Sequence, residues 1–316
     1  MNMMKTMMWG MATALGLAGA PVMAQTFPDR PITMIIPLGA GGSHDLMARV
    51  MTSVLPSVLG QPVVVQLMPG AGGQTGTAAA AAAPADGYTL LFTHNFIDQL
   101  QQFVTELPYD PNEDFVTVVR SNTAQPVLVV REDSQFETFE DMVTYAQANP
   151  GALRFGHSGN WGAFMVPGLA LMQEVGADVT LIPYQGGGPA MQAVMAGDVD
   201  FTFAFPSVLT GQDLRALLVV GEDAIVEGVP TTSELGYDLV SDIGVMHRSV
   251  LAPAGTPEDR LEILRAAFVS MNEDPTYLQL LGRLEENSAM MSGPEFNEMR
   301  AEQAVGYKAL VESFTQ

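Results

Sequence analysis

The chain has 316 residues, with 35 acidic side chains against 13 lysines and arginines and a formal net charge of −22 at pH 7. It contains no cysteine, which excludes disulfides, thiolate nucleophiles and cysteine metal sites. Nucleic acid is not expected as a partner, because phosphate neutralisation needs a basic face. An acidic surface keeps a protein soluble, and adaptation to salty surroundings would give the same composition.

The first 24 residues have the pattern of a secretory signal peptide. A lysine precedes an apolar stretch from Met7 to Gly19, and Val22-Met23-Ala24 has the small residues of a signal-peptidase site. The alternative, a membrane anchor, needs about 20 uninterrupted apolar residues, and Pro21 interrupts this stretch. We therefore expect residues 1–24 to be cleaved before Gln25 and the mature protein to be soluble in the periplasm, with enough chain for two lobes.

Strand-like and helix-like patterns alternate along the rest of the chain, which predicts an α/β fold with parallel sheets covered on both faces. Strands are expected at 32–38, 63–68, 88–94, 114–120, 126–132, 153–158, 179–184, 199–205, 214–220 and 247–253. Helices are expected after Ser43, from Thr75 to before Pro84, and at 137–148, 163–175, 189–196, 257–272 and 294–314. The first helix is indicated by apolar residues at helical spacing, with Pro56 expected to end or bend it; these residues are Leu46, Met47, Val50, Met51, Val54, Leu55 and Val58.

Four glycine clusters follow strand-like runs: GAGGS (39–43), PGAGGQTG (69–76), GHSGNWG (156–162) and YQGGGPA (184–190). In α/β sheets, ligands bind outside the carboxyl ends of strands. Glycine lets backbone amides approach a ligand, and amides at a helix start attract anions. One such cluster would be only a tight turn, but four favour a carboxylate or phosphate site in one cleft.

Motifs for catalysis and cofactor binding are missing. His44 stands where a dinucleotide fingerprint needs glycine, no Gly-Lys-Ser/Thr exists, and GHSGN misses the G-x-S-x-G elbow by one residue. The four histidines, at 44, 94, 157 and 247, have no metal-binding spacing. We therefore expect no enzyme, cofactor or metal. The alternative is an exported α/β hydrolase or lyase that acts on an acidic substrate.

Five ordered blocks then resemble the Bug family of extracytoplasmic binding proteins, the solute receptors of tripartite tricarboxylate transporters. They are FPDRPITMIIPLGAGGSHDLMARV, LGQPVVVQLMPGAGGQTGTAAAAAAPADGYTLLF, LPYDPNEDF, PYQGGGPAMQAVMAGDVD and LAPAGTPEDR, and the resemblance runs from about Phe27 to Tyr307. It implies a two-lobed, type II-like periplasmic binding protein whose lobes, each a mostly parallel sheet flanked by helices, close on a small carboxylate. The carboxylate then passes to a two-component membrane permease. A receptor that presents its ligand to a membrane sensor is the alternative. We expect a monomer.

The resemblance also implies a division of the chain and a set of ligand contacts. Lobe 1 would contain residues 25–122 and 249–316, including the C-terminal helices, and lobe 2 residues 123–248. Family members hold the carboxylate mainly with first-lobe amides and waters; the matching residues are Gly41, Gly42, Ser43, Asp45, Gly72, Gly73, Thr75 and Gly76. The second lobe would contribute His157, Ser158, Gly159, Asn160, Trp161, Tyr184, Gln185 and Gly186. Further candidates are His44, Thr93, His94, Asn95 and Ala204.

Two features refine these expectations. The charge of Asp45 would repel a carboxylate, so we expect it to cap loop amides and the helix start. Met165 and Ala204 stand where family members often carry polar or acidic residues, and Trp161, Phe203 and Phe205 are nearby. These residues predict a carboxylate with an apolar or aromatic far end, and a small dicarboxylate is the alternative.

Overall fold

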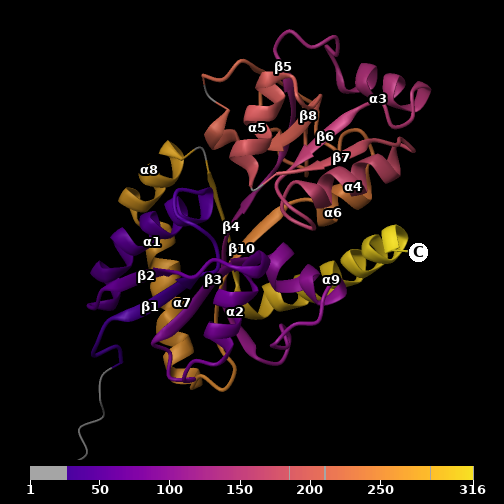
Figure 1. Ribbon diagram of the computed structural model, residues 1–316. Helices are drawn as coiled ribbons and strands as arrows, with labels where there is room; N and C mark the ends of the chain where they lie inside the picture. Colours follow the sequence, from indigo (N-terminus) through magenta and orange to yellow (C-terminus); the bar gives the residue numbers. More distant parts are fainter. Residues whose placement is uncertain (1–26, 185, 210, 285, 316) are drawn as a thin grey trace, which may run out of the picture.

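The computed structural model describes residues 27–184, 186–209, 211–284 and 286–315 of the chain. The expected signal peptide and Gln185 lie outside these residues. The described elements form two lobes, each a β-sheet flanked by helices (Figure 1), so the predicted two-lobed α/β fold is confirmed. Over the described ranges, no helix combines the length and the apolar character that crossing a membrane requires.

The sheet of the first lobe has the strand order β11-β4-β10-β3-β1-β2. β1 pairs in parallel with β2 and β3, whereas β10 runs antiparallel to β3 and β4, and β11 antiparallel to β4. The sheet is therefore mixed rather than mostly parallel, because β4 and β10 lead the chain out of the lobe and back. The strands are β1 (Ile32–Ile36), β2 (Val63–Leu67), β3 (Thr89–His94), β4 (Phe115–Ala124), β10 (Met246–Pro253) and β11 (Asn287–Ser292).

Helices cover both faces of this sheet, which explains its continuous apolar strands. Met34 and Ile36 pack in one core cluster with residues of α1, α7 and α8, and Ile35 packs in another with Ala80 of α2. The helices are α1 (Ser43–Leu59), α2 (Gln74–Ala81), α7 (Glu258–Glu273) and α8 (Pro275–Arg283), with shorter turns η1 (Ala71–Gly73), η2 (Phe96–Leu100) and η3 (Gln101–Phe103).

α1 begins at Ser43 and buries only one side of its apolar stripe. Leu46 and Val58, each 41% exposed, lie at the margin of that side. Pro56 is expected from the sequence to end or bend the helix; it lies inside the helix and does not end it, and the bend stays a prediction. Gly60 ends the helix in the left-handed conformation, with φ of 69°. The buried residues of α1 are His44, Asp45, Met47, Ala48, Met51, Val54, Leu55 and Leu59.

The second lobe has the strand order β7-β6-β8-β5-β9 and is also mixed. β6 is parallel to β7 and β8, and β5 is antiparallel to β8 and β9. Its strands are β5 (Val127–Arg131), β6 (Arg154–His157), β7 (Thr180–Pro183), β8 (Phe201–Ala204) and β9 (Leu214–Val219). Its helices are α3 (Phe139–Ala148), α4 (Met165–Glu174), α5 (Gly187–Ala196) and α6 (Asp238–Ile243), with the short η4 (Pro206–Val208).

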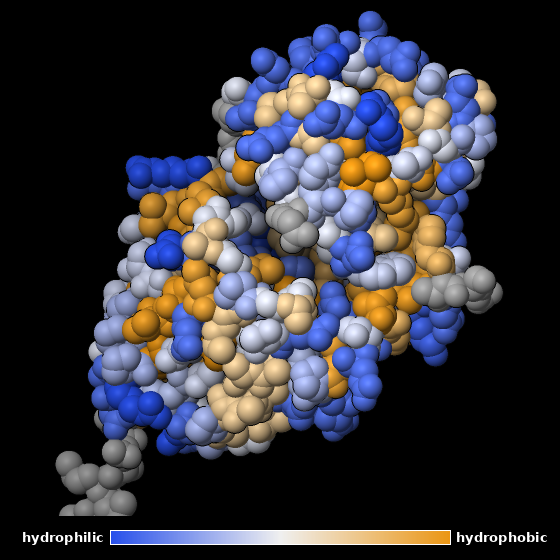
Figure 2. Space-filling model, in the orientation of Figure 1, coloured by the Kyte–Doolittle hydropathy of each residue, from blue (hydrophilic) through white to orange (hydrophobic). Residues whose placement is uncertain are grey.

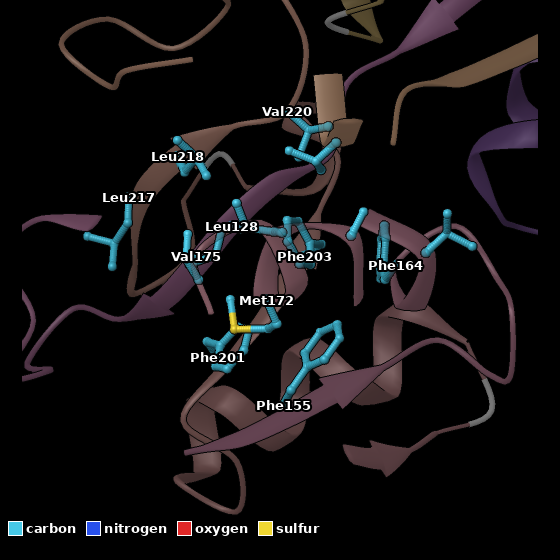
Figure 3. Packing of buried hydrophobic residues seen from close by; sticks show 14 of the residues in the cluster. Leu128, Phe155, Phe164, Met172, Val175, Phe201, Phe203, Leu217, Leu218 and Val220 are labelled. Carbon is cyan, nitrogen blue, oxygen red and sulfur yellow. The ribbon is translucent and has the colours of Figure 1, made fainter. Parts of the chain in front are cut away.

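Aromatic rings fill the core of the second lobe (Figure 3). Phe155 and Phe201 stack with centroids 4.8 Å apart, and Phe203 meets Phe155 edge-on. Gly168 lets α4 approach closely, because a Cβ there would lie 2.2 Å from the Phe155 ring. Each fully buried phenylalanine contributes about 1.5–3 kcal/mol, so this cluster stabilises the lobe without any disulfide.

The lobes are joined by two crossings that lie side by side. β4 and β10 pair from Ala124 with Met246 to Phe115 with Pro253, and the chain leaves and re-enters the first lobe at the end of this ladder. Asn95, directly after β3, donates a hydrogen bond to the Val245 carbonyl at 2.9 Å. The structure thus places a paired, buried two-strand connection between the lobes.

The C-terminal helix α9 (Gly293–Thr315) contacts both lobes (Figure 1). Its Arg300 forms a buried ion pair with Asp98 of η2 at 2.7 Å, which attaches this part of the helix to the first lobe. Further along, Tyr307 and Leu310 belong to the core cluster of the second lobe. The expectation that the C-terminal helices return to the first lobe therefore fits α7 and α8 but describes only part of α9.

Candidate functional site: the cleft between the lobes

A cleft of about 880 Å³ lies between the two lobes, and the hollow is visible in Figure 2. It lies beyond the carboxyl ends of β1, β3, β6, β7 and β8, as expected for a ligand site in α/β sheets. We call its sides the first-lobe wall and the second-lobe wall. The first-lobe wall consists of Leu38–His44, Gly72, His94, Phe96, Ile97 and Gln101. The second-lobe wall consists of Ser158–Phe164, Pro183, Tyr184, Gly186–Pro189 and Phe205, and Met246 lies at the crossing.

All four glycine clusters contribute to the cleft. Gly41 and Gly42 precede α1, Gly72 precedes α2, Gly162 precedes α4, and Gly186 precedes α5. The first amides of a helix have no partner within the helix and lie at the positive end of its dipole. Helix starts from both lobes therefore face one space, and the cleft suits an anion.

The loop before α1 is the most open part of the first-lobe wall. A Cβ on Gly41 or Gly42 would meet no atom within 4 Å, and Gly41 has φ of +80°, which favours glycine. The Gly41 amide donates a hydrogen bond to Oδ2 of Asp45 at 2.9 Å. Asp45 is buried and pairs with Arg49 at 3.0 Å, so it holds the loop from behind.

Two buried histidines support this wall. The rings of His44 and His94 lie with centroids 5.1 Å apart. Burial, followed by the positive charge of Arg248, lowers the pKa of His94 to about 3. Burial also lowers the pKa of His44, with smaller effects from His94 and Arg248. Both rings are therefore neutral at pH 7. Within the described residues, Nε2 of His44 and Nδ1 of His94 have no hydrogen-bond partner.

A fully buried arginine lies behind the first-lobe wall. Arg248 of β10 donates to Oε2 of Glu286 at 2.7 Å and to Oγ of Ser43 at 3.1 Å. Asn122 donates to the same carboxylate oxygen at 2.9 Å. Since Oγ of Ser43 accepts from Arg248, its own hydroxyl proton is free to point elsewhere, including into the cleft. The charges of Arg248 and Glu286 cancel, so this ion pair adds no net charge behind the first-lobe wall.

Aromatic side chains dominate the second-lobe wall. The rings of Phe164 and Phe205 lie 5.3 Å apart, and Trp161 stands beside them in the lining. Trp161 has φ of 54°, a conformation that is uncommon for a non-glycine residue and typical of ligand-binding segments. A Cβ on Gly187 would lie 2.4 Å from the Phe164 ring, so this ring lies against the first residue of α5.

The structure brings most of the residues predicted from the sequence to the cleft. The predicted residues that line it are Gly41, Gly42, Ser43, His44, Gly72, His94, Ser158, Gly159, Asn160, Trp161, Tyr184 and Gly186. Gln185 lies outside the described residues.

Four other predicted residues lie outside the lining and have structural surroundings instead. Gly73 packs against Ile97, with its Cβ position 2.6 Å from that side chain. Gly76 lets α2 approach the loop after β1, because a Cβ there would lie 2.8 Å from Pro37. Thr75 is exposed beside Gly70. Asp45 is the buried loop cap described above, as the sequence predicts, although it does not cap the helix start.

The remaining four are also outside the lining and are buried in other surroundings. Thr93 and Asn95 flank His94 in sequence, and Asn95 bonds to the crossing. His157 lies 3.0 Å from the Gly159 carbonyl through Nδ1, and burial lowers its pKa. Ala204 packs in a core cluster with Val127, Val129 and Val219.

Sequence reasoning missed several lining residues. Phe164 follows the GHSGNWG cluster closely and could have been predicted from it. Gln101, Phe96 and Ile97 lie in helical turns without any motif. Met165 is buried, and its Sδ accepts the Trp161 amide at 3.1 Å. Phe203 is a core residue. The aromatic character predicted near the cleft is therefore supplied by Trp161, Phe164 and Phe205.

Two lobes, a paired crossing and a cleft lined by glycine loops from both sides define a two-lobed solute-binding protein. The family described as tripartite tricarboxylate transporter family receptor matches residues 47–315. A relative from Cupriavidus necator, a UPF0065 protein in the gbd 5' region, is 33% identical over 310 residues, covering 95% of this chain and 92% of its own. BugT of Bordetella pertussis is 36% identical over 253 residues, 78% and 76% of the two chains. The chain belongs to this receptor family, whose Bug members it resembles in sequence.

Solved structures agree with this assignment. A structure described as a periplasmic transporter superimposes with a TM-score of 0.81 at 29% identity, covering 92% of this chain and 98% of the other. The periplasmic binding protein BugD gives 0.79 at 23% identity, over 91% and 98% of the chains, and shows the shared fold. MatC of Rhodopseudomonas palustris, solved with bound malate, gives 0.78 at 25% identity over 90% and 100%. The matched family is one of receptors rather than enzymes.

Proposed function

We propose that the chain is exported to the periplasm, loses its first 24 residues, captures a small carboxylate as a monomer and delivers it to a two-component membrane permease of the tripartite tricarboxylate type. The observation that carries the proposal is the convergence of helix starts from both lobes on one cleft with no charged side chain in its described lining. The matched family and the malate of MatC support a carboxylate as the ligand.

The loop before α1 would hold the carboxylate. The amides of Gly42 and Ser43 and the hydroxyl of Ser43 are hydrogen-bond donors at an open helix start, and the neutral rings of His44 and His94 lie in the same wall. The net charge of −22 does not prevent this, because charges beyond about 8 Å are largely screened at physiological salt. The second-lobe wall, through residues 158–161, Tyr184 and Gly186, would then close over the ligand.

Closure would be a hinge motion at the paired crossing of β4 and β10. The proposed division assigns residues 25–122 and 249–316 to lobe 1 and residues 123–248 to lobe 2, with α9 in contact with both. Small-angle scattering of the mature protein should show a smaller radius of gyration with a saturating ligand than without one. An unchanged radius would mean that the free protein is already closed or that no hinge operates.

A glycine substitution tests the anion site. Gly42→Val places a side chain in open space at the helix start, so the fold should persist while ligand amides are blocked. Each hydrogen bond to a charged group contributes about 1.5–3 kcal/mol, so affinity should fall roughly tenfold to hundredfold for whichever carboxylate a calorimetric panel finds to bind. Gly282→Val is the matched control, since its Cβ also meets nothing within 4 Å. Equal affinities in the two variants would contradict the proposal.

The location and processing are tested separately. N-terminal sequencing of the protein recovered from the periplasm should begin at or near Gln25. Recovery of the intact Met1 end in the inner membrane would contradict export with cleavage, while leaving the ligand site unaffected.

A further inference from the structure

The cleft has no charged side chain among its described lining residues, although the chain as a whole is strongly acidic. The two lining histidines are held neutral at pH 7 by burial and by Arg248. A ligand with a second ionised group would therefore meet no side-chain counter-charge there, and taking an ion out of water without such a partner is unfavourable.

The helix starts of the two lobes also differ in the side chains beside them. At α1, Gly41 and Gly42 leave the space above the amides open. In the loop before α4, the Trp161 amide donates to the Sδ atom of Met165, and at α5 the Phe164 ring lies against Gly187, although Cβ positions on Gly186 and Gly188 would be as open as those on Gly41 and Gly42. Apolar groups thus flank both helix starts on the second-lobe wall.

The same wall offers a surface suited to a flat apolar group. Phe164 and Phe205 pack 5.3 Å apart, and Trp161 stands beside them with part of its surface exposed. Aromatic pairs at such distances attract each other beyond simple burial of area. Ser158, Asn160 and Tyr184 in the lining are neutral and suit at most an uncharged polar substituent.

We propose that the ligand is a monocarboxylate with an apolar, preferably aromatic, body: its carboxylate lies at Gly42 and Ser43, and its body lies against Trp161, Phe164 and Phe205. This inference rests on the proposed function as a carboxylate receptor. It separates this chain from a receptor for a small hydroxylated dicarboxylate such as the malate bound to MatC. A second carboxylate on the ligand would bind at the amide of Gly188, which is exposed at the second position of α5. The experiment must therefore exclude a ligand with two carboxylates.

Matched acid pairs test the inference on the purified mature protein by isothermal titration calorimetry. Benzoate and hexanoate carry one carboxylate; terephthalate adds a second one to the benzoate ring, and adipate has a second one in place of the terminal methyl group of hexanoate. We expect benzoate and hexanoate to bind at least tenfold more tightly than terephthalate and adipate, and benzoate more tightly than malate. Equal or tighter binding of either diacid, or no binding of benzoate, phenylacetate and hexanoate at millimolar concentration, would overturn the inference.

Benzamide and hexanamide separate this inference from the proposed function. Both amides should bind at least tenfold more weakly than the corresponding acids. Amides that bind as well as the acids would overturn the carboxylate receptor itself. If the amides bind weakly but the diacids bind more tightly than the monoacids, the carboxylate receptor stands and only the inference that the ligand is a monocarboxylate is overturned.

A substitution in the second-lobe wall gives a second, independent test of where the ligand body lies. Trp161→Arg places a cation on the second-lobe wall at a half-buried position. It should weaken benzoate binding at least tenfold and raise the affinity for terephthalate and adipate relative to their monoacids. Phe314→Ala, an exposed aromatic position near the end of α9, is the control and should leave all four affinities unchanged. A Trp161→Arg variant that binds benzoate like the parent protein would contradict the placement of the ligand body.

Discussion

The two walls of the cleft are built from the same kind of local sequence, a glycine cluster between a strand and a helix, yet they offer a ligand different chemistry. Around Gly42 the first-lobe wall is open, with two neutral histidines and a paired arginine behind it. The second-lobe wall places Trp161, Phe164 and Phe205 beside its glycines. The difference shows that glycine loops position amides, while the side chains around them decide which amides remain accessible.

The largest expected effect concerns the ion pair behind the first-lobe wall. Arg248→Met leaves Glu286 buried without its cation, and breaking a buried pair in this way costs about 3–5 kcal/mol. Urea denaturation should show a loss of this size. Arg131→Met, which removes the cation of the exposed pair with Asp133, should cost at most about 1 kcal/mol.

The double variant Arg248→Met/Glu286→Leu sharpens this test, because it removes both charges. It should recover most of the stability that Arg248→Met loses. Equal stability of Arg248→Met and Arg131→Met would mean that the buried pair does not support the first-lobe wall.

The second prediction separates a hinge residue from a cleft residue of the same type. Asn95 donates to the Val245 carbonyl and to the Tyr307 hydroxyl, and its Oδ1 accepts from the His247 amide. Asn95→Ala should lower the free energy of unfolding by about 1–3 kcal/mol, because buried partners lose their bonds. Asn160→Ala, on the exposed second-lobe loop, should stay within about 0.5 kcal/mol of the parent protein. The reverse order would contradict a structural role for the Asn95 hydrogen bonds at the crossing.

The third prediction concerns the neutral histidines of the first-lobe wall. The pKa of His94 is about 3 in the folded protein, against about 6.5 in the unfolded chain. Between these pH values the unfolded chain binds a proton that the folded protein does not, so stability should fall as the pH drops below about 6.5. The loss from His94 alone is about 1.4 kcal/mol per pH unit.

Denaturation curves at pH 7 and pH 5 measure this loss. His94→Gln should make the fall between the two pH values shallower, while stability above pH 7 keeps its pH dependence. An unchanged slope in His94→Gln would show that His94 is already protonated in the folded protein.

The smallest effect is expected at the loop cap. Asp45→Ala removes the acceptor of the Gly41 amide, which contributes about 0.5–1.5 kcal/mol. Carboxylate affinity should therefore fall by roughly two- to tenfold, with the second-lobe wall unaffected. Asp133→Ala, at an exposed position, is the control. A gain in affinity would show that the charge of Asp45 acts on the ligand directly.

Much of the architecture could be predicted, because its signals are local. Apolar strand runs followed by glycines located the cleft, and glycine before Ser43 located the start of α1. α8 was missed although Asp274 and Pro275 form a strong helix start, with Asp274 accepting from two backbone amides. β11 had no such signal, because its sequence lacks an apolar strand pattern. It is a strand because it pairs with β4.

The site itself was harder to predict than the fold. Side chains alternate along a strand, so only one of two neighbours at a strand end can face the cleft. The sequence places Thr93, His94 and Asn95 together, and the register of β3 decides that His94 lies in the lining. Arg248 and Glu286 are 38 residues apart and meet only in the folded protein. The contrast between the two walls is therefore a tertiary property.

The central claim is that the carboxylate binds to the first-lobe wall and the apolar body to the second-lobe wall. A crystal structure of the mature protein with phenylacetate tests it most directly. The carboxylate oxygens should lie within about 2.7–3.2 Å of the amides of Gly42 and Ser43, with the phenyl ring against Trp161 and Phe205. A carboxylate bound at Gly187 and Gly188, with the ring toward α1, would contradict the account.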